Sequence, residues 1–207
     1  MPDKTSHIAN SIDINTNAMK GLLKKLIDQN VQLQQRNGNI IINTGDSASI
    51  KEEALALSTH KAEVLDFLKD KKIAGLSLTQ ENIWLACQPK DSAHYHHADF
   101  FQINGHFDQN AFLKALKYLS GRHESLRTGF SMLEGTLIQE VHPVANISFD
   151  IVNLMASAKP EQAQQLAAIK TVFYEDSFDL SLPSLIRAKV IKPKEDQFLV
   201  EIGRAHV

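Results

Sequence analysis

The chain has 207 residues, 43% of them hydrophobic and 22% charged, with a formal net charge of −2. This composition suits one globular domain or two small ones, and it provides no basic field for binding nucleic acid. The single cysteine, Cys87, excludes an internal disulfide and a four-cysteine zinc site. No stretch approaches the ~20 apolar residues of a membrane helix, so we expect a cytoplasmic protein.

The first predicted element is an amphipathic helix that follows a polar extension. Residues 1–17 are rich in Asn and Ser and are expected to be disordered. Apolar residues then recur at i, i+3, i+4, i+7 and i+8, which is the spacing of one helix face. These residues are Met19, Leu22, Leu23, Leu26 and Ile27.

A β-hairpin is predicted next, because Asn37-Gly38 provides the positive φ angles that a type I′ turn requires. The return strand contains Ile40, Ile41 and Ile42, so apolar side chains lie on both of its faces. Neither charge nor proline protects the edge of this strand. Two interpretations stay open. The hairpin either has no role beyond packing, or the edge of its return strand accepts a peptide by strand addition. Two helices follow, and residues 18–72 form the first predicted module.

This module resembles the N-terminal β-hairpin docking domain of nonribosomal peptide synthetases and hybrid polyketide assembly lines. The resemblance rests on "MKGLLKKLIDQNVQL", on the Asn-Gly hairpin and on "THKAEVLDFL", and its most specific part is His60–Glu63. It implies that the partner is the C-terminal tail of an upstream synthetase subunit, held as an added strand. The implied contact residues are the edge Ile40, Ile41, Ile42, Asn43 and Thr44, with Lys51 and Lys61 as candidates for pairing with an acidic tail.

A second module is predicted after a linker at residues 73–76. Ser77 and Gln80 form a capping box that opens a helix carrying Trp84. Helices and strands then alternate to residue 201, which predicts an α+β or α/β fold with a packed sheet. The last strand contains "QFLV", and its alternating pattern breaks at Gly203 and Arg204.

Three segments of this module resemble the N-terminal half of a nonribosomal peptide synthetase condensation domain. They are "LSLTQENIWL", "RHESLRTGF" and "SFDLSLPSLIRAKV". The resemblance implies a chloramphenicol-acetyltransferase-like fold and mainly structural motif residues, with substrate contact as the alternative for Arg122 and Arg127. The matching residues are Ser77, Gln80, Trp84, Arg122, His123, Glu124, Leu126, Arg127, Thr128, Phe130, Phe178, Asp179, Leu180 and Arg187.

The implied chemistry is peptide-bond formation between thioesters carried on the phosphopantetheine arms of carrier domains, with no cofactor bound directly. In the family, a His-His-x-x-x-Asp-Gly motif carries this reaction through its second histidine. The only comparable run here is "HYHHADF", in which Asp99 lies two residues after His97 rather than four. A solvated loop is favoured for this run over a weak metal site on His94 and His96. No catalytic residue and no metal site are therefore predicted.

The final run, "EIGRAHV", resembles the translation of a common sequencing adapter, so residues 202–207 are expected to be non-native. The partial condensation domain then spans residues 77–201. The leading hypothesis is an N-terminal fragment of a synthetase subunit, inactive by itself. The alternatives are a standalone docking adaptor and a small acyltransferase that uses His106 or His142.

Overall fold

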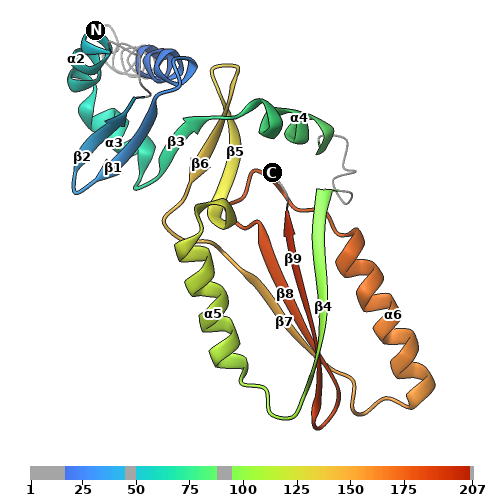
Figure 1. Cartoon of the computed structure of the whole chain (residues 1–207). Coiled ribbons are helices and arrows are strands. Elements are labelled where there is room, and N and C mark those ends of the chain that lie inside the picture. The colour runs from blue at the N-terminus through green and yellow to red at the C-terminus, as the bar shows by residue number, and fades with distance from the viewer. Residues whose placement is uncertain (1–16, 45–49, 88–94, 206–207) are drawn as a thin grey trace, which may run out of the picture. The chain divides into compact units, whose positions relative to one another are not determined.

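The computed structural model describes residues 17–44, 50–87 and 95–205, so nearly all of the expected disordered extension lies outside the described residues. The chain divides into two compact units, which are described separately (Figure 1). The first contains the chain up to Leu76 together with Phe130–Val141, and the second contains Ser77–Gly129 and everything from His142 onward. No helix in the described part of the chain is long and apolar enough to cross a membrane.

The first unit is built on a five-stranded sheet. After a helix over residues 17–28 come β1 (Gln32–Arg36), β2 (Asn39–Asn43), α2 (Lys51–Thr59), α3 (Lys61–Leu68) and β3 (Lys72–Gly75). The strands β5 (Thr128–Leu133) and β6 (Thr136–Val141) complete the sheet in the order β2-β1-β3-β6-β5. β1 pairs antiparallel with both β2 and β3.

The core of this unit confirms the helix and the hairpin expected from the sequence. Leu23 and Leu26 of the first helix are fully buried beside Leu33 of β1. The hairpin turn has φ angles of 51° at Asn37 and 72° at Gly38, as a type I′ turn requires. Apolar periodicity and turn chemistry therefore predicted these elements correctly.

The expected linker at residues 73–76 was wrong, because most of it belongs to strand β3. Ile73 and Ala74 of this strand are buried, and β3 pairs with β6 as well as with β1. The β5–β6 hairpin supplies Leu133 and Ile138 to the same core. The first unit therefore differs from the expected module at 18–72, since it recruits strands from much later in the chain.

The second unit is a mixed α/β assembly around a four-stranded sheet. Its elements are α4 (Leu78–Cys87), β4 (His96–Asn104), α5 (Gln109–Arg122), the 3-10 helix η2 (Glu124–Arg127), β7 (Ser148–Asn153), α6 (Lys159–Glu175), β8 (Ile186–Lys194) and β9 (Gln197–Ala205). The strand order is β4-β9-β8-β7, in which β7 and β8 are parallel and the other pairs are antiparallel. The predicted mixing of helices with a packed sheet is confirmed.

Two long helices cover opposite faces of this sheet. Ile202 of β9 packs into the cluster that contains Leu116 of α5. On the next residue, Gly203, an added Cβ would lie 3.2 Å from the ring of Phe173 on α6. Because successive strand residues point to opposite faces, α5 and α6 lie on different sides of the sheet (Figure 1).

The strand β9 does not end where the sequence pattern breaks. It continues through Ala205, with Ile202 paired to Asp99 and Gly203 to Ala98. The glycine interrupts the hydrophobic alternation at a position where α6 packs closely against the strand, so an added Cβ would crowd the side chains of Phe173 and Arg187. The non-native origin of residues 202–207 stays a prediction, and residues 206 and 207 lie outside the described part.

Candidate functional site

The first condensation-like segment forms the start of α4. The backbone N–H of Gln80 donates to Ser77 Oγ at 3.2 Å, and the N–H of Ser77 donates to Gln80 Oε1 at 2.9 Å. This is the reciprocal pair of a capping box. Trp84 lies half-buried one turn further along α4. The hydrogen bonds of Ser77 and Gln80 fix the beginning of the helix.

The second segment joins the end of α5 to β5 through η2. The Arg127 guanidinium donates to the backbone carbonyl of His142 and lies 3.7 Å from the Glu124 carboxylate. Its Nε atom is buried and has no hydrogen-bond partner among the described atoms. Thr128 Oγ1 donates to the carbonyl of Glu124 at 2.8 Å. Arg127 thus holds two distant segments of the second unit together.

The remaining residues of this segment differ in their surroundings. Arg122 and His123 are exposed at the end of α5, and the pairing expected for Arg122 stays a prediction. Leu126 packs against the cluster around Leu116, and Phe130 is buried. Arg127, Thr128, Leu126 and Phe130 have the contacts of structural residues, and the structure does not bring them together into a reactive cluster.

The third segment is organised around Arg187 of β8. Its guanidinium donates to the carbonyls of Phe173 at 2.5 Å and Asp176 at 2.6 Å, and it forms an ion pair with the Asp176 carboxylate at 3.1 Å. It also lies over the rings of Phe173 and Phe178, with 4.9 Å and 4.4 Å to the ring centres. The Arg187 side chain is only 11% exposed. This one side chain therefore ties the end of α6 to the segment that leads into β8.

The turn before β8 is fixed by the two other matched residues. Asp179 accepts hydrogen bonds from the N–H of Ser181 at 2.9 Å and from its hydroxyl at 2.6 Å. Leu180 is buried. A groove of about 400 Å³ lies beside this turn and is lined in part by Asp179, Ser184 and Arg187.

His96 and His97 of "HYHHADF" do not lie in the solvated loop that we expected. The strand β4 begins at His96, so His96 and His97 point to opposite faces of the sheet. His96 is half-buried and accepts the Phe178 N–H at Nε2 (3.2 Å), with its ring edge-on to that of Phe178 at 4.8 Å. Burial, together with the nearby Arg187 charge, lowers the pKa of His96 to about 4. His96 is a neutral packing residue at pH 7.

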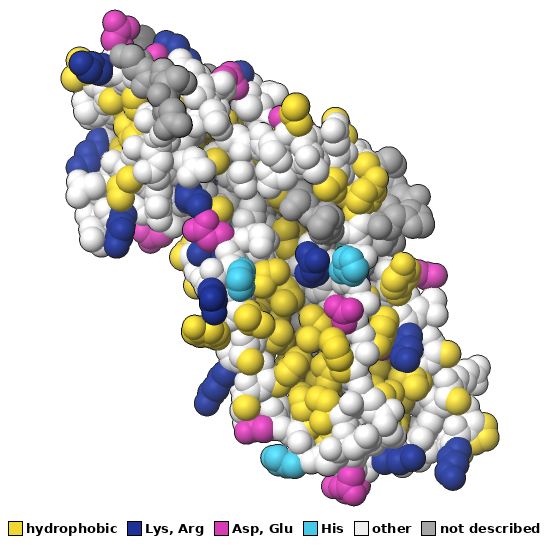
Figure 2. Space-filling view, in the orientation of Figure 1, with side chains coloured by type: hydrophobic (Ala, Val, Ile, Leu, Met, Phe, Trp, Pro, Cys, Tyr) yellow, Lys and Arg dark blue, Asp and Glu magenta, His cyan; other side chains and the backbone are white. Residues whose placement is uncertain are grey.

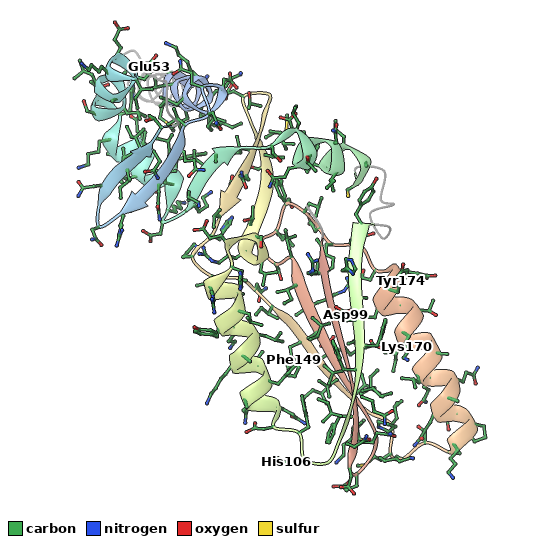
Figure 3. All side chains as sticks on the ribbon, in the orientation of Figure 1. Glu53, Asp99, His106, Phe149, Lys170 and Tyr174 are labelled. Atoms are coloured by element: carbon green, nitrogen blue, oxygen red, sulfur yellow. The ribbon has the colours of Figure 1, made fainter. Side chains whose placement is uncertain are left out.

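The other members of that run differ in how far the structure describes them. His97 and Asp99 are exposed (Asp99 is labelled in Figure 3), and His94 lies outside the described residues. Among the residues that the structure describes, no group of three His, Cys, Asp or Glu side chains could hold a metal ion.

The alternative catalytic histidines lie outside the three condensation-like segments. His106 is exposed in the loop between β4 and α5 (Figure 3). His142 follows β6, and its backbone exchanges hydrogen bonds with Arg127.

The hairpin edge of the first unit lies beside a groove. β2 is the edge strand of its sheet, and Ile40 and Ile42 pack on the core while Ile41 points to the opposite face. A groove of about 200 Å³ runs between β2 and α2–α3 and is lined by Asn39, Ile40, Ile42, Ala54, Leu57, Ser58 and Lys61. Lys61 Nζ donates to Asn39 Oδ1 at 3.2 Å. Asn43, Thr44 and Lys51 are exposed outside the groove lining.

A buried carboxylate that was not predicted from the sequence is that of Glu201, which is fully buried in β9. Neither of its oxygens has a hydrogen-bond partner among the described atoms. Burial raises the pKa of Glu201, while the charges of Lys170 and Lys189 oppose that rise. The only sequence feature that could have indicated this buried carboxylate is that Glu201 is a single charged residue within the otherwise apolar run "FLVEI".

Comparison with known proteins places most of the chain in one family. The model of the condensation domain family matches residues 70–206. A linear gramicidin synthase protein of Brevibacillus parabrevis is 30% identical over 133 residues, which cover 64% of this chain and 2% of that protein. Surfactin synthase subunit 2 of Bacillus subtilis is 32% identical over 105 residues, which cover 51% of this chain and 3% of that protein.

The solved structures agree with the sequence comparison. The starter condensation domain of rhizomide synthetase RzmA superposes with a TM-score of 0.57 and 27% sequence identity, covering 65% of this chain and 34% of that one. The chain therefore spans about a third of that structure and a few per cent of the curated relatives. With a matched fold, matched segments and a family model that extends over residues 70–206, the chain belongs to the condensation domain family of nonribosomal peptide synthetases.

Proposed function

We propose that this chain is part of a nonribosomal peptide synthetase whose condensation domain forms peptide bonds between carrier-bound substrates. In that reaction, the amine of the downstream aminoacyl group attacks the upstream thioester carbonyl. A C–N bond forms, the C–S bond breaks, and the released thiol receives the proton. The phosphopantetheine arms of carrier domains deliver both substrates.

The observation that carries this proposal is the arrangement of the second unit. Arg127 and Arg187 each join segments that are distant in sequence, and both belong to the condensation-like segments. The contacts of Arg187 hold α6 against the sheet whose strand β9 would precede the His-His-x-x-x-Asp-Gly motif. The 207 residues contain no such motif, so we expect this chain by itself to have no condensation activity.

The gene sequence beyond the codon for Val200 provides the first test. We expect a reading frame that encodes His-His-x-x-x-Asp-Gly directly after β9. In the extended protein, replacing the second motif histidine with alanine should abolish transfer between two loaded carrier domains. The control His97→Ala, at an exposed position, should keep the activity. A genuine stop codon after Val207 would contradict the proposal.

A second role is supported by the free edge of β2. The type I′ turn makes Arg36 and Asn39 a hydrogen-bonded pair, and bonded pairs alternate along an antiparallel ladder. The N–H and C=O groups of Ile40 and Ile42 therefore point away from β1. We propose that a C-terminal tail of an upstream synthetase adds as a strand to this edge, with Lys61 in the adjoining groove close to acidic side chains.

Nuclear magnetic resonance of the full chain can test this edge. A synthetic peptide with the tail sequence of the upstream synthetase is titrated into labelled protein. The amide signals of Ile40 and Ile42 should shift more than that of Ile41, whose N–H already bonds to β1. Shifts confined to the helix over 17–28 would refute strand addition.

A matched pair of variants tests whether the peptide binds at the β2 edge or elsewhere on the sheet. Ile41 and Gln34 lie directly opposite each other, but only Ile41 is on the edge strand. Ile41→Asp removes apolar contact with an added strand and should weaken the peptide about tenfold, which is about 1.4 kcal/mol. Gln34→Asp should leave the affinity within about twofold.

If the gene does end after Val207, peptide binding at β2 would support the adaptor hypothesis instead. The acyltransferase hypothesis has weaker support, because His106 lies in an exposed loop and the described contacts of His142 with Arg127 are through its backbone. Any transfer activity that survives His106→Ala and His142→Ala would dispose of that hypothesis.

A further inference from the structure

A cleft distinct from the two grooves described above lies between α6 and the sheet of the second unit. It has a volume of about 890 Å³ and is lined by residues of α6, by Gln102 of β4 and by Leu199 of β9. This volume is within the usual range of small-molecule sites. Lys170, labelled in Figure 3, lines the end of the cleft that is nearer the C-terminus of α6. We call it the α6 cleft.

The cleft exists because α6 is packed tightly against the sheet only near its C-terminal end. There Phe173 is buried, its carbonyl accepts a hydrogen bond from Arg187, and its ring lies over Gly203. Toward the N-terminal end of the same helix face, Leu166 remains half-buried. Leu199, on the sheet beneath, is also only half-buried. Apolar surface on both walls is therefore left without a packing partner from the described residues.

The lining combines this apolar surface with positive charge. Leu154, Met155, Leu166 and Leu199 provide apolar contacts, and none of the residues that line the cleft is acidic. Three lysines line it, namely Lys159, Lys170 and Lys194, and the structure shows no ion pair for any of them within its described ranges. Lys170 interacts electrostatically with the buried Glu201 carboxylate, so Lys159 and Lys194 are the lysines whose charge is left for a ligand. An apolar wall beside these two lysines is complementary to an anion with an apolar tail.

Two of these lysines lie at the same end of the cleft. Gln162 Nε2 donates to the carbonyls of Leu154 at 2.7 Å and Pro193 at 3.3 Å, which brings Lys194 close to the first turn of α6 and to Lys159. The N-cap residue, Ala158, makes no side-chain capping bond. The positive end of the helix dipole therefore adds to the lysine charges at this mouth.

At the opposite end of the cleft, the side chains of Lys170 and Phe100 present mainly apolar surface. The Lys170 ammonium lies 5.2 Å from the centre of the Phe100 ring. Its alkyl stem and that ring extend the apolar wall. From Lys159 to Lys170 the helix rises about 16 Å, which is long enough for an extended alkyl chain of medium length.

We propose that the α6 cleft binds a medium-chain fatty carboxylate. The carboxylate lies at the mouth between Lys159 and Lys194. The alkyl chain runs between Leu166 and Leu199 toward Phe100. This site is separate from the condensation chemistry and from the β2 edge, so neither proposal depends on the other.

Calorimetric titration of the full chain with dodecanoate, below its micelle concentration, tests the site. Lys159→Glu combined with Lys194→Glu should weaken binding at least tenfold, because both side chains are exposed and their reversal leaves the packing unchanged. The control Lys117→Glu, on the exposed face of α5, should have no effect. Equal loss in both variants would show a general charge effect and would overturn the proposal.

The chemical class of the ligand is tested with related probes. Dodecyltrimethylammonium, which has the same chain with a positive head, should bind at least tenfold more weakly. Inorganic phosphate alone should not compete at millimolar concentration. If the cation binds equally well, or if phosphate displaces dodecanoate, the ligand class is wrong.

The location is tested by replacing apolar residues on the two sides of the sheet with polar ones. Leu166→Gln should abolish dodecanoate binding, whereas Phe101→Ser, on the α5 side of the sheet, should not. The circular dichroism of both variants is compared with that of the parent chain. If Leu166→Gln unfolds, photo-crosslinking with a diazirine-bearing fatty acid replaces it, and adducts at Phe101 or Ile151 instead of α6 would overturn the proposal.

Discussion

Two arginines of one segment, five residues apart, have very different surroundings. Arg127 is 15% exposed and donates to the His142 carbonyl, whereas Arg122 is exposed on α5. Arg127→Ala should lower the free energy of unfolding by about 1–3 kcal/mol, because it leaves a carbonyl unpaired. Arg122→Ala should change it by less than about 0.5 kcal/mol. Urea denaturation of the full chain measures both, and equal effects would contradict a structural role specific to Arg127.

His96 should make the stability of the second unit depend on pH. Burial and Arg187 lower its pKa to about 4 from 6.5, so the unfolded chain binds a proton more readily than the folded one. This contribution is fully present above pH 6.5 and is lost as the pH falls from 6.5 toward 4.

Comparison of His96→Gln with His97→Gln isolates this contribution. A glutamine at position 96 can still accept the Phe178 N–H, but it does not titrate. Between pH 7 and pH 4.5, the parent chain should lose on the order of 2 kcal/mol more stability than His96→Gln does. His97→Gln, at an exposed position, should behave like the parent. The same pH dependence in all three proteins would show that His96 is not its source.

At the scale of elements, two exposed glycines should respond to alanine with opposite signs. Gly38 has a φ of 72° in the hairpin turn, so Gly38→Ala should destabilise the first unit by about 1–2 kcal/mol. Gly21 lies within the first helix and has open space around it. Gly21→Ala should stabilise the first unit by about 0.5–1 kcal/mol. Thermal unfolding measures both, and destabilisation by both variants would contradict the helix at residues 17–28.

The strand β3 shows what element-scale patterns miss. Its four residues, Lys72–Gly75, are too few to display an alternation and end in a glycine. Its assignment as a strand depends on pairing with β1 and β6, whose nearest residues are about 40 positions earlier and 65 positions later. The local sequence resembles a linker, and only these remote partners make it the central strand of its sheet.

At the scale of the molecule, the second unit exposes an apolar sheet face. Phe101 of β4 is 51% exposed and Ile151 of β7 is 43% exposed. Both lie on the α5 side of the sheet, where hydrophobic side chains gather in Figure 2. Surfaces of this kind favour association. We therefore expect the chain to self-associate in solution.

Light scattering coupled to size-exclusion chromatography measures this association. Phe101→Ser together with Ile151→Thr should shift the chain toward monomer. Tyr118→Ser, which removes a single exposed ring on α5, should leave the distribution unchanged. A parent chain that elutes as a uniform monomer would contradict the expectation.

The sequence alone determined the features that depend on contacts within a few residues. The Ser77–Gln80 capping box, the Asn37-Gly38 turn and the amphipathic first helix all formed as predicted. Each rests on a hydrogen bond or a periodicity that is closed locally. The three condensation-like segments could also be recognised from the sequence, because each motif is a pattern of neighbouring residues.

Only the tertiary structure decided which distant residues share a core or a sheet. It placed β5–β6 with the first unit and extended β9 through Ala205. It also packed His96 edge-on against Phe178 and left Glu201 without a hydrogen-bond partner among the described atoms. The α6 cleft likewise arises from how a helix meets a sheet. Burial and strand pairing are set by partners far along the chain, so no window of neighbouring residues contains the information that fixes them.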